Sequence, residues 1–333
     1  MKNIILVDFI SSQKANFSHI LSESSGQEWE NCCCQTNHLH GSKFVTFLRF
    51  FWYFVFPLKI VLRRKHYSKI IGWQQFYGLN FAFWCRLFRL KKVNDLTVMT
   101  FIYKRKSGGA GLLYHKYMSY IVTSKYIDRF ICFAKEECEY YSDLFVVDRN
   151  KFVFVPLGKG MPELKKEEDE GYIFATGRSN RDYDFLVRAL TGTDYKCIIA
   201  CDTYKRNEFP SNITVLNDCY GEKMQALMAK CHCVAIPLKD LKMSSGQLVA
   251  IQAMSLGKPV ICTKSDGIKD YVMDGITGFL IENQPDQLLS TLDKLYSQDK
   301  IYKNMSENSM ASYKSKFTED AMYRRIADIV NGK

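Results

Sequence analysis

Residues 243–263 read MSSGQLVAIQAMSLGKPVICT, and their pattern is typical of a helix and a strand of an α/β sheet. A Ser-Ser-Gly-Gln turn opens an apolar helix, the helix ends at Gly257, and a short apolar strand follows at 259–263. The free backbone N–H groups and the dipole of a helix N-terminus attract anions without any positive side chain. Gly246 allows a ligand to approach the backbone closely. The turn is therefore predicted to hold a phosphate, although serine N-capping alone would also explain it.

The same alternation of apolar strands and amphipathic helices extends outward in both directions. In the N-terminal half, a first strand is predicted at 3–9, a polar loop extends from there to about residue 42, and further strands begin the segments 67–78, 96–111, 127–141 and 151–160. In the C-terminal half, strands are predicted at 172–177, 197–202, 213–217, 233–238, 259–263 and 278–281, with helices at 182–190, 221–230, 246–256 and 285–297. This alternation predicts an α/β fold with parallel sheets that helices cover on both faces.

The length of 333 residues predicts two domains of about 150 residues each. The charged, apolar-poor stretch 161–171 is predicted to be the linker between an N-terminal domain at 1–160 and a C-terminal domain at 172–310. Residues 311–333 contain an amphipathic helix with Thr318 as N-cap, expected to pack back on the N-terminal domain. Two doubly wound, Rossmann-like domains would face a central cleft, with ligands outside the carboxyl ends of the strands.

Positive charge is concentrated in the N-terminal half. Residues 43–106 contain fourteen Lys or Arg and a single acid, Asp95, whereas the whole chain has a net charge of +11. The apolar segment 44–65 has the length of a membrane span, but Arg49, Pro57 and Lys59 lie inside it, and a charge in a bilayer is costly. We interpret it as an interfacial helix on an anionic membrane, at the inner face. The alternative is a helix of the domain core whose charged side chains reach out to water.

Several other classes of protein are disfavoured by the sequence. The twelve cysteines include no Cys-x-x-Cys pair, and Cys231 and Cys233 lie in a predicted strand, so we expect no metal site and a reducing, cytoplasmic compartment. There is no Walker-type phosphate loop and no Gly-x-Gly-x-x-Gly after a strand, which disfavours nucleotide hydrolases and dinucleotide-binding proteins. Binding of nucleic acid is also disfavoured, because long apolar runs interrupt the positive charges.

A second candidate loop is TGRSNRD, residues 176–182. A strand ends at Gly177, Arg178 and Arg181 follow, and a helix starts near Asp182. Two guanidinium groups beside a helix N-terminus suit a diphosphate, through bidentate hydrogen bonds. The alternative is a solvated turn in which both arginines pair with Asp182 and Asp184.

The order of these pieces resembles the nucleotide-sugar domain of group 1 glycosyltransferases of the GT-B fold. The residues that carry the resemblance are TGR at 176–178, SSGQLVAIQAMSLGKPVICT at 244–263 and SDGIKDYVMDGITGFLI at 265–281. It implies a GT-B fold, in which Arg178 binds the donor diphosphate and Arg181 takes the place of a family lysine. The backbone N–H groups of Ser245, Gly246, Gln247 and Leu248 would bind the distal phosphate and the sugar. Ser244 and Gln252 stand where the family has two glutamates, for the sugar and for the ribose hydroxyls.

The resemblance places the acceptor in the N-terminal domain. The family often has a histidine near the reacting carbon, but the corresponding loops, 73–78 and 101–109, contain neither a histidine nor a carboxylate. Gln75 and Tyr77 are candidates for orienting an acceptor hydroxyl, and Lys104 or Arg105 for contacting a phosphate. The missing base favours retention of configuration, since the leaving phosphate can take the proton.

The resemblance therefore implies transfer of a sugar from a nucleotide-diphosphate sugar to a lipid-linked or cell-envelope glycan. No metal and no cofactor is expected. The alternative is an inactive sugar-nucleotide-binding or scaffold protein of the same fold, because Ser244 and Gln252 replace the glutamates.

Overall fold

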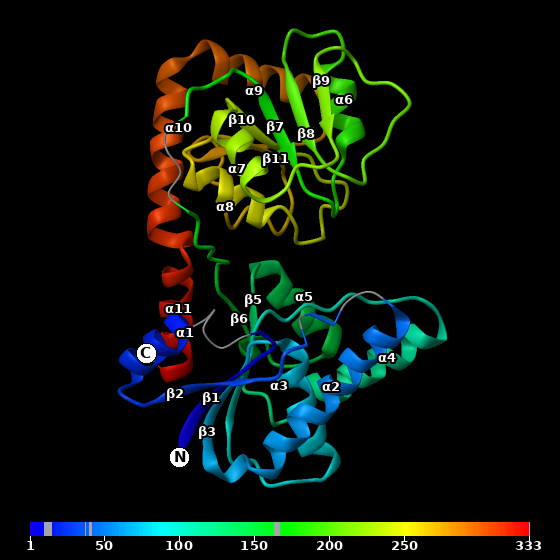
Figure 1. Cartoon of the computed structure of the whole chain (residues 1–333), viewed down its shortest axis with the longest axis vertical. Helices are drawn as coiled ribbons and strands as arrows, with labels where there is room; N and C mark the ends of the chain where they lie inside the picture. Colours follow the sequence, from blue (N-terminus) through cyan, green and yellow to red (C-terminus); the bar gives the residue numbers. More distant parts are fainter. Residues whose placement is uncertain (10–14, 37, 40–41, 163–166, 333) are drawn as a thin grey trace. The chain divides into compact units, whose positions relative to one another are not determined.

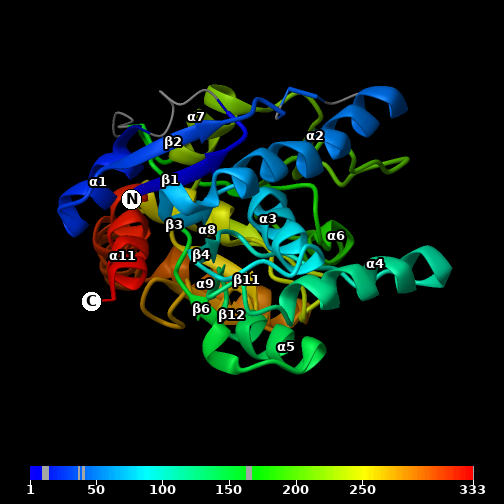
Figure 2. The ribbon, with the colours of Figure 1, turned by 90° about the horizontal axis from the view of Figure 1, so that it is seen from below.

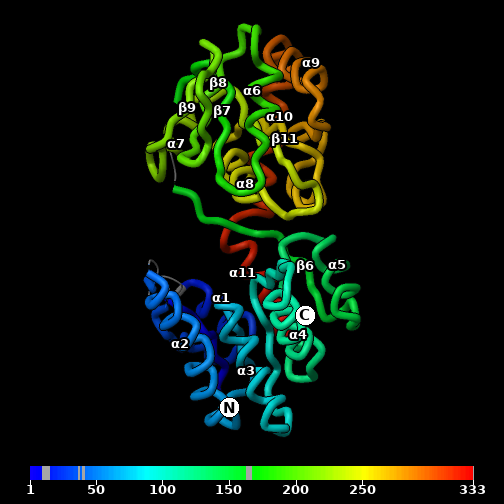
Figure 3. Tube along the Cα trace, turned by 90° about the vertical axis from the view of Figure 1, so that its right-hand side faces the viewer, coloured from blue at the N-terminus to red at the C-terminus, as the bar shows by residue number. Residues whose placement is uncertain are grey.

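The computed structural model describes residues 1–9, 15–36, 38–39, 42–162 and 167–332. The chain divides into two compact units, each with its own sheet and its own helices (Figure 1). The N-terminal unit comprises Met1–Val155 together with Tyr323–Lys333, and the C-terminal unit comprises Pro156–Met322. Figure 3 shows the chain leaving the N-terminal unit after β6 and returning to it through α11.

The N-terminal unit is built on a six-stranded parallel sheet in the order β2-β1-β3-β4-β5-β6. Strands that helices cover on both faces must be apolar along their length, and residues 3–7 of β1 are all buried. The elements are β1 (Lys2–Val7), α1 (Ala15–Ser25), β2 (Trp29–Cys33), α2 (Lys43–Leu62), β3 (Tyr67–Gly72), α3 (Gln75–Leu87), β4 (Asp95–Val98), α4 (Gly108–Val122), β5 (Arg129–Cys132), α5 (Lys135–Phe145) and β6 (Phe152–Phe154).

The C-terminal unit has a second six-stranded parallel sheet, in the order β12-β11-β10-β7-β8-β9. All six strands predicted for this half are present, and β7, β10 and β11 are buried at every residue. The elements are β7 (Ile173–Thr176), α6 (Tyr183–Leu190), β8 (Cys197–Ala200), β9 (Ile213–Leu216), α7 (Gly221–Lys230), β10 (Cys233–Ile236), α8 (Gln247–Ser255), β11 (Val260–Thr263), β12 (Gly278–Ile281), α9 (Pro285–Ser297) and α10 (Asp299–Ser312). The last helix, α11 (Glu319–Asn331), begins in this unit and continues from Tyr323 in the N-terminal unit.

The predicted polar loop from residue 10 to 42 was wrong in part. The structure places α1 and β2 within it. Among the strands that the structure describes, β2 pairs only with β1, at the edge of the sheet, and four of its five residues are partly exposed. An edge strand with this exposure does not need a continuous apolar run, so its sequence, WENCC, gives little signal.

Hydrogen bonds from α3 fix helix α2 near its internal proline. Pro57 has no N–H, so it leaves the carbonyl of Tyr53, four residues earlier, without its helical donor. The Nδ2 of Asn80, a fully buried residue of α3, donates to that carbonyl at 2.8 Å, and Trp84 Nε1 donates to the carbonyl of Phe54 at 2.9 Å. The C-terminal half of α2 therefore belongs to the core of the unit.

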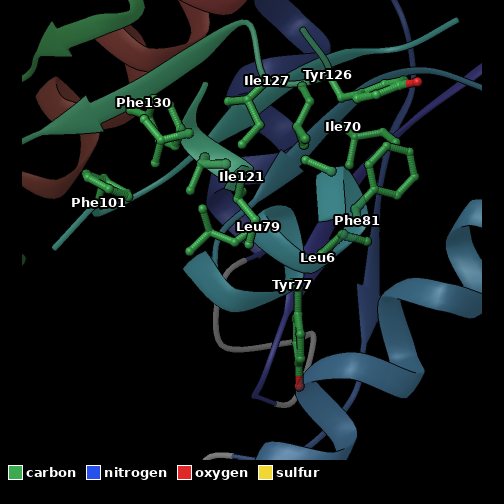
Figure 4. Close-up of a cluster of buried hydrophobic side chains, with 14 of the residues drawn as sticks. Leu6, Ile70, Tyr77, Leu79, Phe81, Phe101, Ile121, Tyr126, Ile127 and Phe130 are labelled. Carbon is green, nitrogen blue, oxygen red and sulfur yellow. The ribbon is translucent and has the colours of Figure 1, made fainter. Parts of the chain in front are cut away.

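The core of the N-terminal unit lies between the sheet and α2, α3 and α4. Figure 4 shows part of it, in which Leu6 of β1, Ile70 of β3 and Leu79 of α3 are all buried. The last helix, α11, begins after Thr318, whose Oγ1 accepts a hydrogen bond from the N–H of Ala321 at 3.2 Å, so the predicted N-cap is confirmed. Further along α11, the ring of Tyr323 lies 4.7 Å from that of Phe17 in α1.

Candidate functional site

Strand order defines where each sheet can bind a ligand. In doubly wound sheets, ligands bind outside the carboxyl ends of the strands, at the point where the strand order reverses direction. In the C-terminal unit this point lies between β7 and β10, and in the N-terminal unit it lies between β1 and β3. The loops after these four strands therefore form the two candidate ligand-binding edges.

The two loops of the C-terminal unit are joined by Asn180, a residue that the sequence analysis did not single out. Its Nδ2 donates to the backbone carbonyl of Asp240 at 2.8 Å and to Ser245 Oγ at 2.9 Å, while its Oδ1 accepts from the N–H of Asp240 at 2.7 Å. Asn180 has a φ of 56°, a left-handed conformation that asparagine tolerates better than most residues. These three bonds hold the loop after β7 against the turn that opens α8.

The turn before α8 depends on Gly246. Its φ is +91°, and a Cβ atom at this position would lie 2.9 Å from Ile236 Cγ2 of β10. Ser244 and Gln247 face inward: Gln247 Nε2 donates to Ser244 Oγ and lies 3.5 Å from the carbonyl of Gly267. Their side chains therefore shape the turn.

The N-terminus of α8 remains suited to an anion. Among the residues that the structure describes, no side chain caps this helix, and its first N–H groups lack helical acceptors. Leu248 is 44% exposed, and Gln252, one turn further along, is partly exposed. The predicted phosphate-binding site thus has the geometry of an open helix N-terminus next to Gly246.

Arg178 lies at the end of β7 with its side chain 60% exposed. Its Nε donates to Asp202 Oδ1, at the end of β8, at 2.7 Å, and its guanidinium lies 5.4 Å from the ring centre of Tyr220, just before α7. Tyr220 and Asp202 together raise the pKa of Arg178, so the side chain stays cationic. Because Asp202 accepts a hydrogen bond from Nε, it orients the guanidinium at the carboxyl end of the sheet.

Arg181 is placed differently from the prediction. Its Nε donates to the carbonyl of Thr176 at 3.0 Å and one outer nitrogen donates to the carbonyl of Ser179 at 2.8 Å. Burial lowers the pKa of this arginine. The guanidinium also fills the space next to Gly177, where a Cβ atom would lie 2.6 Å from it. Arg181 therefore braces its own loop, and we withdraw it as a group that contacts the diphosphate.

In the N-terminal unit, the reversal point brings together two residues that are 66 positions apart. Asp8 follows β1 and Gln74 follows β3, and Gln74 Nε2 donates to Asp8 Oδ2 at 2.9 Å. The other end of the same amide, Oε1, accepts from the N–H of Phe76 at 3.3 Å at the start of α3. Asp8 is partly exposed. The sequence analysis missed this carboxylate, although it is the first polar residue after a buried strand.

The predicted acceptor residues are mostly engaged elsewhere. Tyr77 is fully buried (Figure 4). Its hydroxyl donates to the carbonyl of Cys34 at 2.8 Å and contacts Thr36 Oγ1 at 2.8 Å. Burial raises its pKa far above the usual range. Gln75 Oε1 accepts from the N–H of Ile102 at 3.1 Å. Both side chains therefore support the fold, whereas Lys104 and Arg105 are exposed in the segment between β4 and α4.

The fold is similar to that of several proteins of known structure. In the solved structures, Anabaena HepE in complex with UDP is similar with a TM-score of 0.68 and 14% identity, over 100% of both chains. The lipopolysaccharide outer core galactosyltransferase WaaB is similar with a TM-score of 0.66 and 12% identity, over 100% of this chain and 99% of the other. The fold is the GT-B fold of glycosyltransferases.

The sequence comparisons match one part of the chain to a family. Residues 160–311 match the family model described as glycosyl transferases group 1, so this part of the chain is a group 1 glycosyltransferase domain. An uncharacterized glycosyltransferase of Methanocaldococcus jannaschii is 25% identical over 171 residues, which are 48% of this chain and 48% of that protein. The chain thus aligns with about half the length of that relative.

Proposed function

We propose that the protein transfers a sugar from a nucleotide-diphosphate sugar to a lipid-linked or cell-envelope glycan. The observation that carries this proposal is the pair of anion-binding features that follow β7 and β10, the two strands at the reversal point of a group 1 domain. Arg178 is oriented by Asp202, and the open N-terminus of α8 is held to the loop after β7 by Asn180. The names of similar proteins point to the substrates: one structure contains UDP-glucose, and another is a lipopolysaccharide galactosyltransferase. The proposed place of action is the cytoplasmic face of the membrane.

The proposed chemistry uses the fixed charges of the C-terminal unit. When the bond between the anomeric carbon and the distal phosphate breaks, negative charge grows on the leaving diphosphate. The N–H groups of α8 and the guanidinium of Arg178 stabilise this charge. They are already in position, so no side chain has to move during the reaction. Such a site works without a metal. The acceptor hydroxyl attacks the same carbon and gives its proton to the leaving phosphate, with retention of configuration.

A donor screen tests this proposal. The purified full chain is incubated with UDP-, GDP- and other sugar nucleotides, with and without a membrane lipid extract as acceptor, and release of nucleoside diphosphate is measured. One donor is expected to turn over, with the same rate in EDTA. Binding of a donor without release, even with the extract, would favour the inactive binding protein instead. NMR of the transferred sugar reports retention or inversion.

Asp8→Asn is expected to lower the transfer rate about 10²-fold. In our proposal the Asp8 carboxylate, oriented by Gln74, accepts a hydrogen bond from the acceptor hydroxyl, and asparagine keeps the size but loses the charge. Donor binding, measured by calorimetry, should not change, because Asp8 belongs to the N-terminal unit. An inverted product would instead require a general base, and loss of transfer in Asp8→Asn would then assign that role to Asp8.

Asp143→Asn, which removes an exposed carboxylate of α5, is the matched control and should have full activity. Equal transfer by the Asp8 and Asp143 variants would remove Asp8 from the acceptor site.

A further inference from the structure

Helix α2 has two different halves. In the described part of the chain it is the one helix with the length and composition to cross a membrane. Its C-terminal half is in the core, where Tyr53 stacks on Phe76 at 5.2 Å and Phe56 packs on Tyr77 at 4.8 Å. The N-terminal half exposes four phenylalanines: Phe44 (69%), Phe47 (63%), Phe50 (48%) and Phe51 (49%). A helix that shares half its length with a protein core cannot span a bilayer, but its exposed half can lie in one leaflet.

A second exposed apolar element lies at the start of α4. Ile102 precedes this helix and is 57% exposed, and Leu112 and Leu113 in its first turns are 55% and 70% exposed. The ring of Tyr117, one turn further along, lies 6.0 Å from that of Phe54 in α2, so the two helices belong to one packed layer with α3. In Figures 1 and 2 the N-terminal turns of α2 and α4 extend to the same side of the N-terminal unit.

Positive charge accompanies both exposed elements. Lys43 begins α2, and Lys104, Arg105 and Lys106 lie exposed directly before α4. The sequence from 43 to 127 contains a single acid, Asp95, and that carboxylate is paired with Arg129 through two hydrogen bonds of 2.7 and 2.9 Å. The surface therefore combines exposed apolar side chains with exposed cations.

We infer that this surface docks the protein on an anionic lipid bilayer. The docking face consists of Phe44, Phe47, Phe50 and Phe51 of α2, Leu112 and Leu113 of α4, and Lys104, Arg105 and Lys106. Apolar insertion by itself, or charge by itself, gives only weak and reversible binding, whereas the two together anchor a protein. A second copy of the chain would bring like charges together, and nucleic acid offers no apolar partner for Phe47 or Leu113, so a bilayer fits this face best.

The test is flotation of the full chain with vesicles of pure phosphatidylcholine or of phosphatidylcholine with phosphatidylglycerol, without any sugar nucleotide. The wild type should float with the anionic vesicles and much less with the neutral ones, and high salt should weaken the binding. The double variant Phe47→Ser/Phe51→Ser should bind at least about 10-fold more weakly, because it removes two apolar side chains from the lipid. Lys104→Glu/Arg105→Glu should do the same by reversing the charge.

The matched controls lie in the C-terminal unit. Ile276→Ser removes an apolar side chain that is 48% exposed, and Lys300→Glu/Lys303→Glu reverses two exposed charges on α10. Both should float like the wild type. Leu113→Gln tests α4 separately, and thermal melts confirm that each variant is folded.

Several outcomes would overturn the inference. The first two are binding of the wild type that is equal for neutral and anionic vesicles, and unchanged binding of the double phenylalanine variant. The other two are self-association of the protein in place of binding to vesicles, and binding that added DNA competes away. The inference does not depend on catalysis, so the two proposals fail separately. Flotation without turnover would support the docking face and count against the transferase, and turnover of a soluble acceptor without flotation would do the reverse.

Discussion

Arg178→Ala is expected to lower the rate of sugar transfer by about 10²–10³-fold, the usual loss when one charge-stabilising group is removed from an active site. The side chain is largely exposed, so the thermal stability of the protein should change little. The effect should appear mainly in kcat, because the charge that Arg178 offsets develops as the bond to the diphosphate breaks. The measurement is steady-state release of nucleoside diphosphate with the donor found in the screen.

Three companion variants make this prediction specific. Arg178→Lys keeps the charge but loses the planar fork, so an intermediate rate is expected. Asp202→Asn keeps an acceptor for Arg178 Nε at 2.7 Å and should cost only a few-fold, roughly the value of one weakened charge-assisted bond. Arg206→Ala removes an exposed arginine of the same unit and should have no effect. Full activity of Arg178→Ala would exclude this residue from stabilising the leaving group.

Gly246→Ala is expected to destabilise the protein by about 2–4 kcal/mol and to abolish tight donor binding. Two causes act together. A φ of +91° is strained for any residue with a Cβ atom, and that atom would lie 2.9 Å from Ile236 Cγ2, a methyl group in the buried strand β10. To relieve the contact, the turn must shift, and with it the N–H groups at the start of α8. Urea denaturation and donor calorimetry measure the two effects.

Gly275→Ala separates these two causes. Gly275 also has a positive φ, of +72°, but nothing lies within 4 Å of the position that its Cβ would take. This variant should therefore show only the backbone strain, about 1 kcal/mol, and normal donor binding. If both variants lost the same stability and both bound the donor normally, the close packing of Gly246 against β10 would not matter to the site.

The sequence was most informative where apolar strands are continuous. The strands of the C-terminal sheet are buried on both faces, so each appears as an apolar run bounded by turn residues, and all six were predicted. α1 and β2 were not predicted. The edge strand β2 has only one buried residue among its five, so it has no continuous apolar run. α10 was not predicted either; only three of its fourteen residues are buried, so its apolar pattern is weak.

The exposed half of α2 shows why the sequence left two interpretations open for residues 44–65. Its aromatic residues are alike in sequence, but Tyr53 and Phe56 pack on α3 while Phe44 and Phe47 face outward. The difference depends on Asn80 and Trp84 of α3. They donate hydrogen bonds to two carbonyls of α2 that lie one turn before Pro57, and so fix the point where α2 joins the core. Such contacts between elements are not encoded in the local pattern.

The sequence was enough to predict the α/β class, the C-terminal strands, the turn before α8 and an arginine, Arg178, at the end of β7, because these depend on local periodicity and on residues close together in the chain. The tertiary structure decided which side chains face a ligand. It turned Arg181 inward, buried Tyr77, joined Asn180 to Ser245 across 65 positions and Asp8 to Gln74 across 66. The reason is physical: strand order brings distant loops to one reversal point, and the packing there sets the direction of each side chain.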